Sequence, residues 1–205
     1  DMTVKPFAIS HDANEPSGYR LEQGGKSVAV ATDLGKYDSY TVECLRNLDA
    51  VLLEANHDIH MLEVGGYPYY LKQRILGDRG HLSNELSGRL LCDILHDNLK
   101  HIVLGHLSKE NNYAKLAYET VKLEVTLADN EYKGDDLDMF VANRDTVSDI
   151  ITVCIKEENK NEKIVLLQYL ARIQWALLQK YVHILRRIKL MFWIFHRPLF
   201  KDILI

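Results

Sequence analysis

The alternation of apolar and polar positions predicts a chain in which short strands and helices follow one another. Short apolar runs rich in β-branched residues predict strands, at 4–10, 19–22, 27–32, 51–55, 101–104 and 139–142, and we expect 139–142 to be the last. Apolar residues spaced by three and four predict helices, at 38–48, 68–76, 84–99 and 112–125. Such alternation is typical of an α/β layered fold.

Two connecting segments have their own pattern. Gly24 and Gly25 separate two strand patterns, which predicts a hairpin. Residues 129–138 are rich in acidic side chains and are predicted to be a loop.

The C-terminal part of the chain differs in pattern and charge. Apolar residues recur at helical spacing from Leu166 to Phe195, which predicts one long amphipathic helix or a helical hairpin that ends before Pro198. Residues 156–205 carry ten basic and four acidic side chains, whereas residues 1–155 carry 15 and 25. We therefore divide the chain into a domain at 1–153 and a basic helical tail at 154–205. The tail is either an out-of-frame or chimeric end, which we favour, or a natural extension that contacts a membrane surface or a partner helix.

Composition sets the broad class. With 47% hydrophobic and 26% charged residues among 205, the chain is ordinary for a globular protein. Its three cysteines are far apart and odd in number, which favours a reducing cytoplasm over a disulfide framework. No apolar run approaches the roughly 20 residues that span a bilayer. The sequence does not indicate the oligomeric state.

Ionisable side chains follow several of the predicted strands directly. They are His11, Asp33, Glu54 and His106, and His81 lies just before the helix predicted from residue 84. Strand ends at one edge of an α/β sheet are common ligand sites. Each residue also has an ordinary interpretation, since a single histidine is usually a hydrogen-bonded structural residue and an aspartate after a strand is often a turn or cap residue.

Together these side chains indicate a hydrolytic metal site. Imidazole and carboxylate ligands without thiolates suit zinc or manganese, and a carboxylate shared by two metals could activate water. His57 and His60 would make a further metal clip if their segment were helical, so His57 is kept as a possible ligand.

Four segments resemble a known family. PFAISHDANEPSGYRLEQGGKSVAVATDLG, LEANHD, RGHLSNELSG and LGHLSKENN occur in this order, and they resemble the middle and later part of YycJ/WalJ-type proteins of the metallo-β-lactamase fold. RNase Z and RNase J have looser versions of the same order. The resemblance covers roughly residues 4–153, and it implies the C-terminal half of an αββα sandwich followed by the helical tail.

The resemblance also implies roles for matching residues. His11 would complete the first metal site, Asp33 would bridge both metals and so take part in catalysis, and His106 would bind the second metal. His81 would help to protonate the leaving oxygen, and Glu54 would orient it. Phosphate contacts are expected at the start of the helix after Gly80-His81 and on nearby basic side chains, namely Ser83, Asn84, Lys72, Arg74 and Arg79.

The chain departs from the family where the family's HxHxDH motif should be. No HxH occurs in it, so we expect an incomplete site for two divalent ions, and apolar surface left bare where the N-terminal half would pack. The implied activity is 5′→3′ exonuclease action on double-stranded DNA. The alternatives are a hydrolase of a small ester, thioester or lactone, or a truncated, inactive product with an interaction helix.

Overall fold

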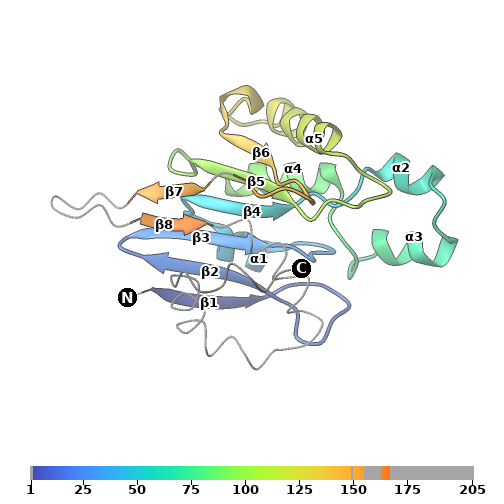
Figure 1. The fold of residues 1–205 in the computed structure, drawn as a ribbon, viewed down its shortest axis with the longest axis horizontal. Helices are drawn as coiled ribbons and strands as arrows, with labels where there is room; N and C mark the ends of the chain where they lie inside the picture. The colour runs from blue at the N-terminus through green and yellow to red at the C-terminus, as the bar shows by residue number, and fades with distance from the viewer. Residues whose placement is uncertain (1, 149, 155–162, 167–205) are drawn as a thin grey trace, which may run out of the picture. The chain divides into compact units, whose positions relative to one another are not determined.

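A computed structural model of the chain describes residues 2–148, 150–154 and 163–166. Their main feature is one six-stranded mixed sheet in the order β1-β2-β3-β4-β5-β6 (Figure 1). The strands are β1 Thr3–Ala8, β2 Ser17–Gln23, β3 Lys26–Ala31, β4 Ala50–Glu54, β5 His101–Gly105 and β6 Met139–Val141. β1, β2 and β3 pair antiparallel, and β3 to β6 pair parallel. The predicted α/β class is confirmed.

Two glycines explain the hairpin between β2 and β3. Gly24 and Gly25 have φ of +55° and +72°, the left-handed region that a two-residue turn between antiparallel strands requires and that glycine enters without a steric penalty. The turn joins β2 to β3, as the glycine pair predicts.

Helices make the crossovers between the parallel strands. They are α1 Ser39–Leu45, α2 Ile59–Val64, α3 Tyr69–Leu76, α4 Asn84–Ile94 and α5 Ala114–Leu127, with a short 3-10 turn at Gly134–Asp136. Asp38, Asp58 and Ser83 cap the first turns of α1, α2 and α4, because each side chain accepts a hydrogen bond from a backbone N–H three residues on. α2 was not predicted. Figure 1 shows α2 and α3 beyond the end of the sheet at which β3 and β4 finish.

The main core lies between the helices and one face of the sheet. Alternate strand residues such as Ala31, Leu53 and Leu104 pack in one buried cluster with Leu91 of α4 and Val121 of α5. This alternation follows from the two-residue period of a strand, which sends successive side chains to opposite faces.

The other face of the sheet is also covered, which corrects an expectation. We expected bare apolar surface, yet Val30, Leu52 and Val103 are only 4%, 3% and 2% exposed. Val153 of β7 (Ile151–Cys154) packs with Val28 and Ala50 in a second buried cluster.

The chain beyond β6 also differs from the prediction. β6 is not the last strand, since β7 pairs antiparallel with β8 (Lys163–Leu166) in a separate two-stranded sheet. The boundary predicted after residue 153 therefore falls within β7, and Leu166, the first position of the predicted tail helix, lies in a strand. The rest of that helix, at 167–205, lies outside the described residues. No helix in the described part of the chain is long and apolar enough to cross a membrane.

Candidate metal centre

The strand directions bring the predicted side chains to one edge of the sheet. β3, β4 and β5 are parallel neighbours, and β1 runs parallel to β3 because β2 is antiparallel to both. The carboxyl ends of these four strands therefore meet at the same edge. His11, Asp33 and His106 follow β1, β3 and β5, and Glu54 is the last residue of β4.

Asp33 and His106 share an uncommon backbone conformation. Their φ angles are +59° and +58°, in the left-handed region that costs a non-glycine residue of order 1–3 kcal/mol. Each lies at the turn that leaves a buried strand, and the conformation directs both side chains back over the sheet edge. Such strain concentrates at functional sites, so it supports a role for these two residues.

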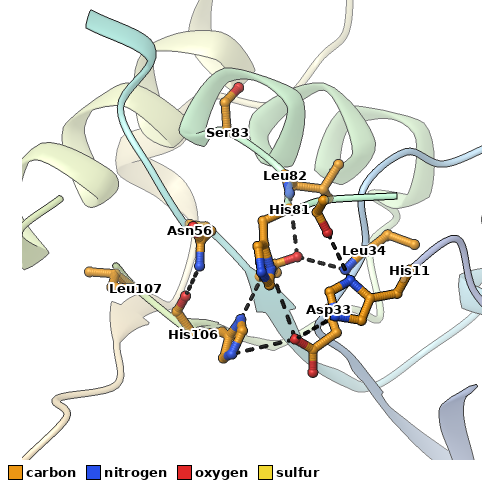
Figure 2. A network of polar contacts seen from close by, with 12 residues as sticks. His11, Asp33, Leu34, Asn56, His81, Leu82, Ser83, His106 and Leu107 are labelled. Carbon is orange, nitrogen blue, oxygen red and sulfur yellow. Dashed lines mark hydrogen bonds and ion pairs between the residues drawn. The ribbon is translucent and has the colours of Figure 1, made fainter. Parts of the chain in front are cut away.

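Three histidines surround the carboxylate of Asp33 (Figure 2). Oδ1 of Asp33 lies 3.6 Å from Nε2 of His11, 3.6 Å from Nε2 of His106 and 3.9 Å from Nδ1 of His81. The His81 ring lies between the other two, with ring centroids 5.0 Å from His11 and 5.2 Å from His106. The structure thus brings His11, Asp33, His81 and His106 together.

The distances suit side chains that share a cation better than side chains that bond to one another. At 3.6 Å, the contacts of Asp33 with His11 and His106 are too long for hydrogen bonds. Two donors in one tetrahedral shell, each about 2.0–2.2 Å from an ion, lie roughly 3.3–3.6 Å apart. The donor set is imidazole and carboxylate, which zinc and manganese both accept. These residues therefore fit a divalent ion.

Glu54 is hydrogen-bonded to two of the three histidines. Its Oε1 accepts hydrogen bonds from Nδ1 of both His81 and His106, each at 2.7 Å. Its Oε2 accepts from the backbone N–H of Leu34 at 2.7 Å. The side chain is 0% exposed, so every strong contact it makes is with the protein.

The charges at Glu54 and His106 stabilise each other. Burial disfavours the ionised form of Glu54, but the hydrogen bonds and charges of His106 and His81 outweigh it and lower the pKa of Glu54 to about 2. Burial likewise disfavours protonated His106, but the hydrogen bond and charge of Glu54 raise the pKa of His106 to about 9. Glu54 is therefore ionised at physiological pH, and it accepts a hydrogen bond from Nδ1–H of His106.

The Nδ1 bonds fix which nitrogen each histidine presents. Nδ1 of His11 donates to the carbonyl of Gly80 at 3.0 Å, and Nδ1 of His106 donates to Glu54. Carbonyl and carboxylate oxygens only accept, so Nδ1 carries the proton in both rings and Nε2 faces Asp33. An imidazole held in this way is oriented to bind a metal through Nε2. In His81 it is likewise Nδ1 that is bonded to Glu54.

Close backbone packing holds the loops that carry these residues. A Cβ on Gly35 would lie 2.4 Å from the carbonyl oxygen of Asp78, and one on Gly80 would lie 2.1 Å from that of Ile75. The N–H of Gly35 donates to the carbonyl of Ser10 at 2.8 Å. The segments that carry His11, Asp33 and His81 therefore pack so tightly that only glycine fits at two positions.

His57 and His60 do not form a metal clip. His60 is exposed in the first turn of α2. His57 is 1% exposed, and neither ring nitrogen has a hydrogen-bond partner in the structure. Burial lowers the pKa of His57 to about 4, so its ring is neutral at physiological pH.

The predicted phosphate contacts divide into buried and accessible ones. Ser83 and Asn84 are 2% and 0% exposed. Ser83 caps α4, and Asn84 bonds to Asn112 through both atoms of its amide. Their role is structural, which corrects the prediction, because the start of α4 is buried. Lys72 donates to the carbonyl of Glu63, and Arg79 is exposed on the loop that precedes His81.

Sequence reasoning missed the asparagines that support the site. The amide of Asn56 donates to the backbone carbonyl of His106 at 2.8 Å, and that of Asn112 donates to the carbonyls of Ala55 and Asn56 at 2.9 and 3.0 Å. Asn56 and Asn112 are 8% and 6% exposed. The local sequence gives no sign of this role, since Asn56 is followed by His57 and Asp58, and Asn112 is preceded by Glu110 and Asn111.

Comparison with known proteins finds sequence relatives that are named exodeoxyribonucleases. No family model matches the chain. Exodeoxyribonuclease WalJ of Streptococcus pneumoniae serotype 2 is 39% identical over 153 residues, which are 75% of this chain and 56% of that protein. Exodeoxyribonuclease YycJ of Bacillus anthracis is 39% identical over 121 residues, 59% of this chain and 46% of that protein. The chain thus spans about half the length of these relatives.

Solved structures are more distant. The metallo-β-lactamase-fold protein YhfI from Bacillus subtilis has a TM-score of 0.45 and 14% identity, over 69% of this chain and 46% of that one. The short form of human tRNase Z has a TM-score of 0.39 and 18% identity, over 53% and 36%.

Proposed function

Because this chain belongs to the YycJ/WalJ-type proteins of the metallo-β-lactamase fold, we propose that it carries the catalytic edge of a metal-dependent phosphodiesterase. One observation carries the proposal. Asp33 lies between two histidines whose Nδ1 atoms are already bonded, so that both Nε2 atoms face its Oδ1 at 3.6 Å. A hydrolytic metal site needs such a preorganised set of donors.

Three side chains would hold the metals. Asp33 would bind both ions, His11 would complete the site of the first, and His106 would bind the second. When bound, divalent ions such as zinc or manganese would supply Lewis acidity to the phosphoryl group and to the attacking water. Three ligands are too few for two ions, so we propose that further ligands come from outside these 205 residues, from an upstream segment or a second chain.

His81 and Glu54 would handle the proton. His81 can present its Nε2 to the leaving oxygen, because Glu54 holds the opposite nitrogen at 2.7 Å. Glu54 also fixes His106, so one carboxylate would orient both a metal ligand and the proton donor.

The substrate we propose is DNA, cleaved as a 5′→3′ exonuclease cleaves double strands. Support comes from the names of the relatives, both exodeoxyribonucleases, and from Arg79, which is exposed on the loop that precedes His81. We expect such a protein to act in the cytoplasm. The net charge of −4 favours the rival, a small ester, thioester or lactone, since a nucleic-acid face is usually basic.

Hydrolysis of two substrates tests the proposal. The complete protein is assayed with zinc or manganese on double-stranded DNA and on a small ester, and the Asp33→Asn variant is compared with Asp138→Asn. Asp138 also contacts a histidine, at 2.6 Å, but that residue is His101 at the start of β5, the opposite end of the strand from His106. We expect DNA cleavage that weakens steeply with salt and is lost only in Asp33→Asn. Ester hydrolysis that is indifferent to salt, with no DNA cleavage, would establish the rival.

A further inference from the structure

Helix α3 exposes aromatic side chains beside the candidate metal centre. None of its residues is buried, and Tyr69 and Tyr70 are 76% and 73% exposed. A surface helix normally contributes an apolar face to the core. Exposed aromatics on a helix without such a face are typical of a binding surface.

The C-terminal end of α3 is hydrogen-bonded to the loop that carries His81. The N–H of His81 donates to the carbonyl of Ile75, in the last turn of α3, at 3.0 Å. Arg74 donates to Oδ2 of Asp12, and Oδ1 of Asp12 lies 3.5 Å from Nε2 of His11. α3 is therefore connected to two of the histidines around Asp33 through single residues.

One of the two tyrosines faces the site. Tyr70 and Arg74 are four residues apart and so lie on the same side of the helix, with Cβ atoms about 5–6 Å apart. Arg74 contacts Asp12, so this side faces the loop that carries His11. Tyr69 is rotated from Tyr70 by about 100° and shares its side with Lys72.

The charge around α3 is locally positive in a chain of net charge −4. α3 contains no acidic residue. Arg74 is paired with Asp12, and the nearby Asp78 is paired with Lys36. Lys72 donates to the backbone carbonyl of Glu63 and points away from Tyr70, two residues before it on the helix. Among the described residues, the exposed Arg79 makes no ion pair, so one positive charge near the end of α3 is left unpaired. An exposed aromatic side chain near an unpaired basic group is typical of surfaces that bind single nucleic-acid strands.

From these observations we propose that Tyr70 stacks on an unpaired base of the DNA strand whose phosphodiester bond enters the metal centre, while Arg79 contacts its phosphates. The proposal rests on the proposed function. Tyr70 lies about 9 Å along the helix axis from the end of α3, which corresponds to two or three nucleotides at about 3.4 Å each. The stacked base is therefore a close neighbour of the bond to be cleaved.

Fluorescence of 2-aminopurine tests the stacking directly. Single-stranded oligonucleotides carrying this base at successive positions from the 5′ end are titrated with the complete protein in EDTA, so that nothing is cleaved. We expect quenching at one or two neighbouring positions, lost in Tyr70→Ala and kept in Tyr70→Phe. Affinity should fall about 5- to 150-fold in Tyr70→Ala, the range for loss of one stacked base. Tyr69→Ala is the matched control and should behave as wild type.

Other outcomes separate this inference from the proposed function. Hydrolysis of bis-p-nitrophenyl phosphate by the wild-type protein tests the proposed function separately, because this substrate is too short to extend from the metal centre to Tyr70. If Tyr70→Ala keeps both the quenching and the affinity, or changes instead the oligomeric mass in sedimentation, the stacking proposal is wrong. If the quenching depends on Tyr70 but no phosphodiester is cleaved with any metal, the stacking proposal stands and the proposed function fails.

Discussion

Nε2 of His106 lies 3.6 Å from Oδ1 of Asp33, and both residues have a left-handed backbone with φ near +60°. The two residues come from the ends of different strands, β5 and β3, which β4 separates in the sheet. Their proximity therefore depends on the pairing of three neighbouring strands. An ion held between them would gain a site that is already formed, without the cost of ordering loops at the moment of binding.

Removing the charge of Glu54 should loosen the site. In Glu54→Gln the amide keeps one acceptor oxygen, and it cannot accept from both imidazoles and from Leu34 as the carboxylate does. We expect metal affinity to fall 10- to 100-fold and the free energy of unfolding to fall by about 1–3 kcal/mol. Calorimetric metal titration and chemical denaturation measure the two. Glu22→Gln, which breaks the ion pairs of Glu22 with Lys5 and Arg20 near the surface, should change neither; equal effects of the two variants would argue against a special role of Glu54.

His57 should make stability depend on pH between 6.5 and 4. Its pKa is about 4 in the folded protein and about 6.5 in an unfolded chain. As pH falls through this window, the unfolded chain binds a proton that the folded one does not, so stability falls by up to about 3 kcal/mol.

The variant His57→Leu should remove that pH dependence. At pH 7 the free energy of unfolding should change by less than about 1.5 kcal/mol, because leucine is similar in size and no hydrogen bond is lost. Urea denaturation at several pH values measures this, with the exposed His60→Leu as the control that keeps the wild-type profile. A large loss of stability at pH 7 would mean that the ring has a partner.

His81 should affect turnover and leave metal binding alone. Its Nδ1 is bonded to Glu54, and its Nε2 is assigned to the leaving oxygen. In His81→Ala we expect kcat on DNA to fall about 10²- to 10⁴-fold with metal affinity within a few-fold of wild type. His101→Ala, which removes a histidine paired with Asp138, should leave kcat unchanged. Loss of metal from His81→Ala would instead make His81 a ligand.

Gly80 should not tolerate a side chain. In Gly80→Ala the new Cβ would lie 2.1 Å from the carbonyl oxygen of Ile75, so the loop must move, and with it the carbonyl that holds His11. We expect a loss of about 1–3 kcal/mol in the free energy of unfolding together with weaker metal binding. Gly66→Ala, with nothing within 4 Å of the added Cβ, is the control. A melting temperature equal to wild type in Gly80→Ala would contradict the close approach.

Much of the edge of the sheet could be predicted because its rules are local. The ends of the strands could be predicted from the apolar runs. Because the strands that precede His11, Asp33 and His106 run in the same direction, these residues meet at one edge of the sheet whatever the path of the loops. It was also predictable that Glu54 lies at this edge of the sheet, because it ends a predicted strand. That its Oε1 accepts from His106 as well as His81 was not, because the hydrogen bond joins two strands through side-chain rotamers that no pattern encodes.

Other errors have equally physical causes. The helix predicted to residue 99 ends at Ile94, because the N–H of Leu95 closes the last turn on Leu91 and the ring of His96 then bonds to the carbonyl of Leu48. Ser83 and Asn84 were expected to offer a phosphate site. Helix N-termini bind anions only where solvent reaches them, and in α4 the N–H of Asn84 donates to the carbonyl of His57.

The central claim is that Asp33, His11 and His106 form a metal centre, and anomalous diffraction at the zinc edge tests it most directly. Crystals of the complete protein grown with zinc should show ions about 2.0–2.2 Å from the carboxylate of Asp33 and about the same distance from Nε2 of His11 and His106. The peaks should vanish in Asp33→Asn and persist in Asp138→Asn. Well-occupied ions elsewhere, with the Asp33 carboxylate bound to none, would contradict the account.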